Sequence, residues 1–208
     1  MFDTMRQFFS AFLPSVFRRY IRDWMQKRQW MAKAPKMLYG YSDSAGGWQA
    51  RTRISDTVSL YRRENIHISD NVYIGHFCVL DGTNELVIEE GVQLAGWNGI
   101  YTHSSHIAIR LYGGHYQDIP ESKKIGYRMG NVSIGRYSFV GAGAKVFSGV
   151  SIGKGALVAA NSVVTRTVED FQIVSGNPAV VTGDTRKLDA KYLKDPQLRE
   201  WYEEWQKN

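Results

Sequence analysis

A repeat of six residues runs through the middle of the chain and constrains its fold more than any other feature. Over residues 134–163, five consecutive units each open with Val or Ile, and all but one carry a small residue at the fifth position, where Val150 is the exception. A period of six fits neither an α-helix nor an alternating strand, and it is the signature of a parallel β-helix in which each unit supplies one short strand and a turn. We therefore expect the opening residue to point inward and the small residue to fill a crowded corner.

A looser form of the same repeat precedes this segment. It covers residues 54–59, 68–79 and 88–99, with a short insertion at 82–84, and it disappears between about 103 and 131. Long segments that leave a compact fold are usually functional or disordered. Because this one follows directly on two histidines, we expect an extruded loop with a functional role.

The amino-terminal segment, residues 1–50, has aromatic and aliphatic residues every three to four positions and predicts an amphipathic helix, which Pro14 divides. Residues 1–36 carry the whole net charge of +6, and the remainder is neutral. Two interpretations stay open: residues 1–30 contact an anionic membrane surface, or the helix packs on the β-helix or a neighbouring subunit. No nucleic-acid-binding motif accompanies the charge, so no nucleic acid partner is expected.

The repeat also ends near Asp184. Residues 184–208 predict a helical cap, with Asp195 as the N-cap and Pro196 at the first helical position. A cap of this kind covers the open end of a β-helix. We expect an all-β main domain, residues 51–183, between two helical segments.

The amino-acid composition indicates the cellular compartment in which the protein is expected. The single cysteine, Cys78, cannot form an internal disulfide and suits a reducing compartment, and its corner position in the repeat indicates packing. No apolar run approaches the ~20 residues that a membrane span requires. Asp3, Arg6 and Pro14 also disfavour a secretory signal. A cytoplasmic protein is expected, peripheral on the inner face of the membrane if the helix binds lipid.

With the repeat, the loop and the histidines in hand, residues 54–183 resemble the hexapeptide-repeat acyltransferases, in particular the galactoside, maltose and polysaccharide O-acetyltransferase branch. The resemblance implies a left-handed parallel β-helix of triangular section, a homotrimer, and acetyl-CoA bound between neighbouring subunits, with no metal. It also implies an acetyl-CoA-dependent O-acetyltransferase that acts on a sugar hydroxyl, in a cell-surface polysaccharide, a lipopolysaccharide or a precursor.

The resemblance assigns the general base to His103, because family members commonly have two histidines separated by two residues just before the loop, and the first is the base. The chemistry suits the residue, since an imidazole that titrates near neutral pH can take a proton from a hydroxyl as it attacks a thioester. A backbone N–H can stabilise the resulting oxyanion. The thiolate is a good leaving group and needs no separate strong acid.

The expected substrate site lies around this base. His76 aligns with an asparagine that holds the acceptor in the sugar acetyltransferases, so a histidine there is a departure from the pattern. A carboxylate can accept two sugar hydroxyls, and aromatic rings suit stacking on sugars. The other residues predicted to bind substrate are Asp81, Trp97, Tyr101, His106 and His115.

The cofactor residues are likewise implied by the resemblance. Gly141, Ala142 and Ala160 are small where the pantetheine approaches the backbone, and Thr165 and Arg166 fall beside the adenine and phosphates of CoA. Arginine suits phosphate because its guanidinium forms paired hydrogen bonds. Small residues also belong at β-helix corners, so a structural role for the first three stays open.

Three alternatives remain at this point. An amino-sugar N-acetyltransferase would use the same base and cofactor. A metal-dependent enzyme similar to the γ-class carbonic anhydrases would need His76, His103 and His106 as ligands, and the last two are close in sequence for that purpose. A non-catalytic trimeric scaffold would leave the histidines and the loop without a role.

Overall fold

The computed structural model describes residues 15–207, so the predicted break at Pro14 and residues 1–14 of the segment 1–30 lie outside the described residues. The chain divides into two units, Met1–Lys36 and Met37–Asn208. In the first, helix α2 (Ser15–Lys33) leaves aromatic side chains such as Phe17, Trp24 and Trp30 exposed. None of the helices within residues 15–207 combines the length and apolar character that a membrane span requires.

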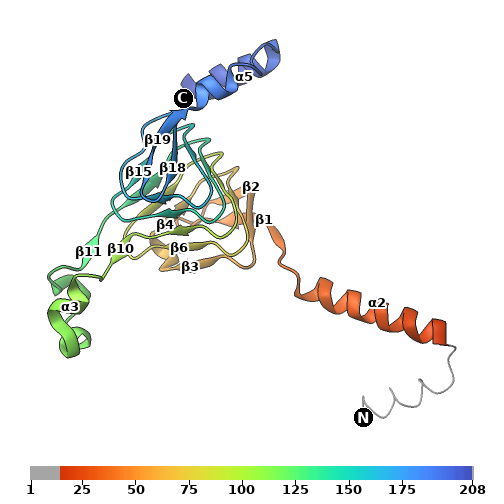
Figure 1. Ribbon diagram of the computed structural model, residues 1–208, viewed down its shortest axis with the longest axis horizontal. Helices are drawn as coiled ribbons and strands as arrows, with labels where there is room; N and C mark the ends of the chain where they lie inside the picture. Colours follow the sequence, from red (N-terminus) through yellow and green to blue (C-terminus); the bar gives the residue numbers. More distant parts are fainter. Residues whose placement is uncertain (1–14, 208) are drawn as a thin grey trace. The chain divides into compact units, whose positions relative to one another are not determined.

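The second unit is a parallel β-helix with three faces, which the chain visits in the order face 1, face 2, face 3 (Figure 1). Face 1 contains β1 (Met37–Ser42), β2 (Trp48–Ser55), β5 (Tyr73–Ile74), β8 (Gln93–Leu94), β13 (Phe139–Val140), β16 (Leu157–Val158), β18 (Gln172–Gly176) and β19 (Ala179–Asp184). Face 2 contains β3 (Ser59–Tyr61), β6 (Val79–Asp81), β9 (Gly99–Ile100), β14 (Lys145–Val146) and β17 (Val163–Val164). Face 3 contains β4 (Ile66–Ile68), β7 (Leu86–Ile88), β12 (Val132–Ile134) and β15 (Ser151–Ile152).

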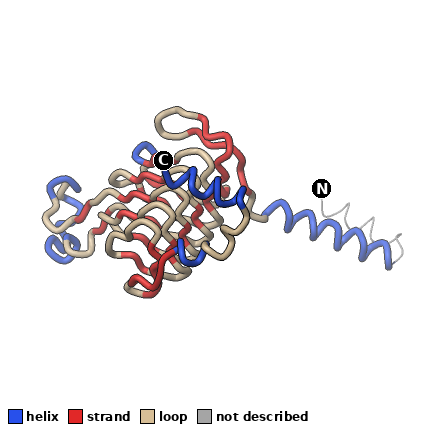
Figure 2. Tube along the Cα trace, turned by 90° about the horizontal axis from the view of Figure 1, so that it is seen from above, coloured by secondary structure: helices blue, strands red, loops and turns tan. Residues whose placement is uncertain are grey.

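The core confirms the inward stacking expected from the repeat. Val140 pairs with Leu94 on one side and Val158 on the other, and equivalent pairs repeat on each face. The opening residues of the five units are at most 2% exposed, and the fifth-position residues, Val150 included, are at most 1% exposed. The stacked coils are visible in Figure 2.

The structure differs from the sequence prediction between residues 37 and 55. The helical segment expected over 1–50 ends at Lys33, and strands β1 and β2 form an antiparallel hairpin on face 1. The ring of Trp48 lies where a Cβ on Gly40 would stand, and Gly40 has a φ of 80°. In β2, the apolar Trp48, Ala50 and Ile54 are separated by polar residues, a pattern that suits a half-buried strand. Face 1 therefore begins at Met37, well before the first repeat unit at Ile54.

The extruded loop leaves the coils after β10 (His103–Ser104) and returns through β11 (Arg128–Met129), which pair antiparallel. It carries helix α3 (Ala108–Tyr112) and the 3-10 turns η2 (Gly113–Asp118) and η3 (Glu121–Lys123), and it extends away from the coils (Figures 1 and 2). A shorter 3-10 turn, η1 (Arg63–Asn65), fills the corner between faces 2 and 3 of the first coil.

The carboxy-terminal end closes with the antiparallel pair β18–β19, helix α4 (Thr185–Asp189) and helix α5 (Pro196–Lys207). The ring centroid of Trp205 lies 4.9 Å from that of Tyr137 and 5.8 Å from that of Phe171. Helix α5 therefore packs against the corner between faces 3 and 1. Leu198 and Trp201 of α5 are exposed.

Candidate active site

His103 stands at the corner between faces 2 and 3, where the chain leaves the coils for the extruded loop. Its backbone pairs with Met129 of the returning strand, which fixes the base of the loop. The side chain is 31% exposed, and its Nδ1 lies 2.6 Å from Oδ2 of Asp81. One ring nitrogen thus contacts a buried carboxylate, while part of the ring remains accessible.

Asp81 ends strand β6 and is nearly inaccessible, at 3% exposed. Its Oδ1 accepts hydrogen bonds from the backbone N–H of Thr83 at 2.9 Å and from Thr83 Oγ1 at 2.6 Å. Its Oδ2 accepts from the backbone N–H of Thr102 at 2.9 Å. Burial alone would raise the pKa of Asp81, but the hydrogen bonds from Thr83, His103 and Thr102 outweigh it and hold the pKa below the ordinary value.

The ionised carboxylate determines the tautomer of His103. A carboxylate can only accept hydrogen bonds, so Nδ1 carries the proton and Nε2 carries a free lone pair. This is the arrangement that a general base requires, with one nitrogen oriented by a carboxylate and the other available to a substrate proton.

Tyr127, on the returning arm of the loop, lies against the His103 ring, with centroids 5.6 Å apart and planes inclined by 18°. Partial burial and the nearby charge of Glu121 raise the pKa of Tyr127 to about 12, so the phenol stays neutral. An ion pair of 2.8 Å between Arg62 and Glu121 ties the loop to the first coil. Tyr127 was missed in the sequence, because the loop has no repeat that assigns its residues to positions.

A second group of predicted residues lies at the corner between faces 1 and 2. Nδ1 of His76 lies 2.6 Å from Oγ of the buried Ser55, which lies 2.8 Å from Oγ1 of Thr57. In the following coils, the residues that occupy the position of His76 in the corner are Gly96, Ala142 and Ala160. We call this row of small residues beside His76 the corner lane.

The cofactor residues predicted from the sequence divide between two corners. Gly141, Ala142 and Ala160 lie along the corner between faces 1 and 2, and Thr165 and Arg166 are exposed at the corner between faces 2 and 3. A Cβ on Gly141 would lie 2.5 Å from the backbone N of Ala160, so coil stacking alone requires glycine there. Its expected contact with the cofactor stays a prediction.

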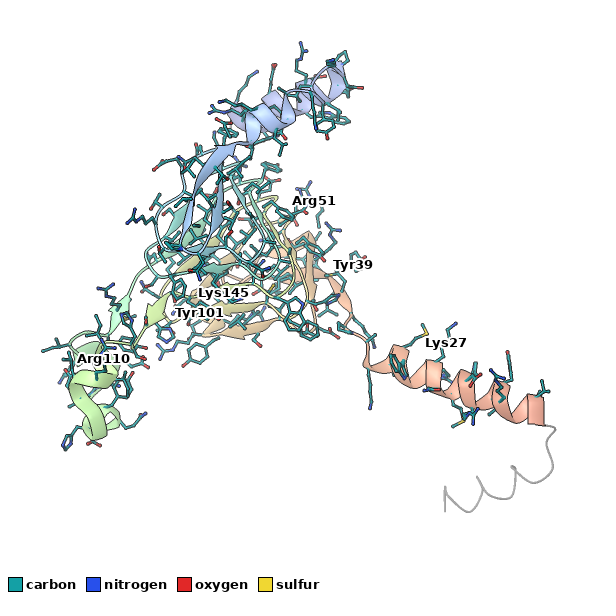
Figure 3. The ribbon with its side chains drawn as sticks, viewed as in Figure 1. Lys27, Tyr39, Arg51, Tyr101, Arg110 and Lys145 are labelled. Carbon is teal, nitrogen blue, oxygen red and sulfur yellow. The ribbon has the colours of Figure 1, made fainter. Side chains whose placement is uncertain are left out.

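Within one chain, His103 and His76 stand at opposite edges of face 2. The strands of this face lie between the two corners, and Tyr101 covers Gly99 on its outer surface and contacts Phe147 (Figure 3). The described residues contain no group of three or more His, Cys, Asp or Glu that could hold a metal ion.

The remaining predicted residues lie apart from the His103–Asp81 pair. His106 is exposed and bonds Ser104 Oγ at 2.6 Å, and His115 is exposed on the loop, 3.5 Å from Asp118. The sequence predicts a substrate contact for Asp81, but both its oxygens are engaged by protein groups, so the structure places it behind His103 instead. Thr83 and Thr102, which hold the carboxylate, were missed for different reasons. Thr83 follows Asp81 by two residues, in the insertion at 82–84 that the repeat does not assign to a position. Thr102 reaches Asp81 from the neighbouring coil, 21 residues further along the chain.

Comparison with known proteins identifies relatives that share the repeat. The family described as "Hexapeptide repeat of succinyl-transferase" matches residues 131–166. The dTDP-4-amino-4,6-dideoxy-D-glucose acyltransferase of Escherichia coli is 32% identical over 145 residues, which cover 61% of this chain and 76% of the relative. The Saccharomyces cerevisiae protein YJL218W, whose name places it among acetyltransferases, is 37% identical over 130 residues, and the chain spans 58% of its length.

Two solved structures share the fold. AntD, an N-acyltransferase from Bacillus cereus solved with dTDP and coenzyme A, superposes with a TM-score of 0.53 at 22% identity, covering 69% of this chain and 88% of AntD. A maltose O-acetyltransferase from Clostridium difficile gives a TM-score of 0.53 at 24% identity, covering 62% of this chain and 64% of the other. The fold that these structures share with the chain implies the left-handed sense expected for its β-helix.

Proposed function

Because the chain belongs to the hexapeptide-repeat acyltransferase family, we propose that it transfers an acetyl group from acetyl-CoA to a sugar hydroxyl, with His103 as the general base. The observation that carries the proposal is the 2.6 Å contact between Asp81 and His103, which leaves Nε2 of the imidazole free to accept a proton. The sugar belongs to a cell-surface polysaccharide or its precursor in this proposal.

In the proposed reaction, Nε2 of His103 removes the hydroxyl proton as the sugar oxygen attacks the thioester carbonyl. A C–O bond forms, the carbonyl becomes an oxyanion, and the collapse of this intermediate breaks the C–S bond. The proton on His103 then passes to the departing thiolate, so the base returns to its neutral form. The ionised Asp81 stabilises the imidazolium that exists between the two transfers, and Tyr127 limits the rotation of the ring.

Acetyl-CoA, when bound, supplies the activated acetyl group. The corner lane fits a pantetheine arm, because Ala142 and Ala160 are exposed and present no bulky side chain beside the backbone. Thr165 and Arg166 would hold the phosphates and the adenine end. These two sets lie at different corners of one chain, so we propose a homotrimer in which neighbouring copies supply one set each.

An amino-sugar N-acyltransferase is the second candidate, favoured by the similarity to the Escherichia coli acyltransferase named for a dTDP-linked amino sugar. The same base would remove a proton from the attacking amine. An assay with two acceptors, methyl glucoside and dTDP-4-amino-4,6-dideoxyglucose, distinguishes the two candidate functions. The acceptor that causes release of free CoA thiol from acetyl-CoA identifies the reaction.

We propose that the protein is cytoplasmic and lies on the inner face of the membrane, which it contacts through its amino-terminal unit. Helix α2 exposes Phe17, Tyr20 and Trp24 and carries five basic residues with described side chains, which suits a surface of anionic lipid. Binding to vesicles of phosphatidylglycerol tests this part of the proposal, and a protein that never binds them contradicts it.

The test of the reaction is the release of free thiol from acetyl-CoA in the presence of a panel of sugars. Wild-type protein is expected to turn over at least one of them, and His103→Ala to lose about 10²–10⁴-fold in kcat while it still binds acetyl-CoA. If His103→Ala retains full turnover, the base is another residue and the proposed mechanism fails.

A further inference from the structure

The tip of the extruded loop carries large aliphatic side chains that the fold leaves in solvent. Leu111 and Ile125 are 61% and 75% exposed. A Cβ on Gly126 would lie 3.2 Å from Cδ1 of Leu111, and the backbone N–H of Ile125 donates to Oη of Tyr112 at 2.8 Å. The end of α3 and residues 125–126 thus lie side by side, and the two aliphatic side chains belong to one part of the loop surface.

The packing of the loop does not explain why Ile125 is apolar. Ala108 is buried, and Ile107 packs against Gly126, so these residues hold α3 on the returning arm of the loop. Ile125 contributes its backbone N–H to this arrangement and leaves its side chain outside. Single exposed aliphatic residues are common on protein surfaces, so the partner has to be identified from the charges around them.

Three cations flank the aliphatic residues in sequence, namely Arg110, Lys123 and Lys124. Arg110, on the outer part of the loop in Figure 3, donates to the backbone carbonyl of His106. Nζ of Lys124 lies 3.9 Å from the centre of the Tyr116 ring. Among residues 15–207, none of the three cations forms an ion pair with a carboxylate, so the tip of the loop combines apolar side chains with uncompensated positive charge.

The acidic residues of the loop do not neutralise this charge. Residues 105–127 contain two of them, Asp118 and Glu121. The carboxylate of Glu121 pairs with Arg62 of the first coil at 2.8 Å, and that of Asp118 lies 3.5 Å from His115. We use the name loop-tip surface for Arg110, Leu111, Lys123, Lys124 and Ile125.

We propose that the loop-tip surface binds a membrane of anionic lipid, with Leu111 and Ile125 inserted at the acyl boundary and the three cations at the headgroups. Elements that lie in the membrane interface present aliphatic side chains bordered by Lys and Arg in this way. Each basic residue close to an anionic leaflet strengthens binding about fivefold. A nucleic acid would match the cations but would leave the aliphatic side chains without a partner.

The loop-tip surface is a second membrane contact, in a different unit of the chain from helix α2. One weak interfacial signal gives marginal and reversible binding, whereas two signals in one chain reinforce each other. The contact does not depend on the proposed acetyl transfer, because it uses neither His103 nor Asp81. Its tests are therefore binding measurements, and their outcome is independent of whether the protein transfers an acetyl group.

The contact is tested with an environment-sensitive NBD label on Ile125→Cys in the full-length protein. Cys78 is buried, so the label attaches at the introduced thiol. With vesicles of phosphatidylglycerol, the emission of the label is expected to rise and shift to the blue, because the label enters an apolar environment. The same label on Val180→Cys, at a comparably exposed site on β19, should not respond. If the protein sediments with the vesicles and the label at residue 125 does not respond, another element binds the lipid and the proposal is overturned.

Charge reversal tests the electrostatic part of the contact. Lys123→Glu is expected to raise the concentration of phosphatidylglycerol vesicles at which the label responds by about tenfold. Lys194→Glu changes the net charge equally at an exposed site outside the loop and should match the unreversed protein. An equal loss in both variants, or an equal response to vesicles of phosphatidylcholine, would overturn the contact with anionic lipid.

A second copy of the chain is the other occupant that the test distinguishes. Without lipid, the NBD label on Ile125→Cys should emit as it does in water, and Ile125→Ser should sediment with the same velocity as wild type. A label that is already shifted to the blue without vesicles, or an Ile125→Ser variant that dissociates relative to wild type, would assign the loop-tip surface to a subunit interface. Either result would overturn its assignment to the membrane.

Discussion

Replacing Asp81 with asparagine tests the pair on which the proposed mechanism depends. The carboxylate accepts hydrogen bonds from two backbone N–H groups, those of Thr83 and Thr102, as well as from the Thr83 hydroxyl and His103. An amide has one accepting oxygen, so in either orientation the introduced side chain turns its NH₂ group toward one of the two backbone donors. An unsatisfied buried donor costs about 1–3 kcal/mol, and we expect the free energy of unfolding to fall by that amount.

The same substitution changes catalysis through His103. If the amide NH₂ faces the imidazole, Nδ1 must accept and Nε2 becomes protonated, so the base is lost. If the amide oxygen faces it, the tautomer survives but the charge that stabilises the imidazolium is gone. We expect kcat to fall by about 10²–10⁴-fold with little change in the affinity for acetyl-CoA.

The assay is the rate of thiol release at saturating substrates, with urea unfolding of the same preparations. Asp70→Asn is the matched control, because Asp70 bonds Arg51 at a partly exposed site far from the loop base. In a His103→Ala background, Asp81→Asn should cause no further loss of turnover. If Asp81→Asn kept a turnover within about twofold of wild type and an unchanged free energy of unfolding, the proposed role of the Asp81–His103 pair would be refuted.

The pH dependence gives a further check on Asp81. Its pKa is lowered in the folded state, so its ionised form stabilises the fold above the ordinary pKa of 3.8, and this contribution disappears as the pH falls through the folded pKa. The difference in unfolding free energy between wild type and Asp81→Asn should therefore be constant near neutral pH and shrink in acid. A difference that grows in acid would contradict the direction of the shift.

Three other parts of the structure can be tested by substitution. Tyr127→Ala should lower kcat by about tenfold while Tyr127→Phe stays near wild type, because the ring and not the hydroxyl lies against His103; equal losses in both variants would point to the hydroxyl. Trp205→Ala should lower the unfolding free energy by about 2 kcal/mol, whereas the exposed Trp201→Ala should change it by less than about 0.5 kcal/mol, as measured by urea unfolding. Charge reversal of Arg19 and Arg22 should weaken sedimentation with phosphatidylglycerol vesicles but not with phosphatidylcholine vesicles, and an equal effect on both would argue against an electrostatic contact.

The repeat made the coils predictable because each coil reuses one stacking rule. An inward Val or Ile and a small corner residue are local requirements, so five units in register were enough to place Val140 and Ala144 in the core. The hairpin at residues 37–55 was not predicted, since aromatic residues at mixed spacing fit a helix or a strand and the pairing with the first coil decides between them.

The candidate site was predictable only in part. The position of His103 before the loop follows from the end of the repeat, and its role from the resemblance. Its partner Asp81 lies 22 residues earlier and reaches it across one coil, which the sequence shows only once the coil length is known. Tyr127 is brought to His103 by the fold of the loop, and no periodic signal assigns a loop residue to a site.

The measurement that tests the central claim most directly is isothermal titration of the purified protein with acetyl-CoA, carried out in parallel on wild type and His103→Ala. The account predicts saturable binding of about one acetyl-CoA per subunit in both proteins, because His103 serves the chemical step and the corner lane serves the cofactor. Absence of binding in both would contradict the assignment of the chain to acetyl transfer. Binding that is lost only in His103→Ala would instead move this histidine from the reaction to the cofactor site.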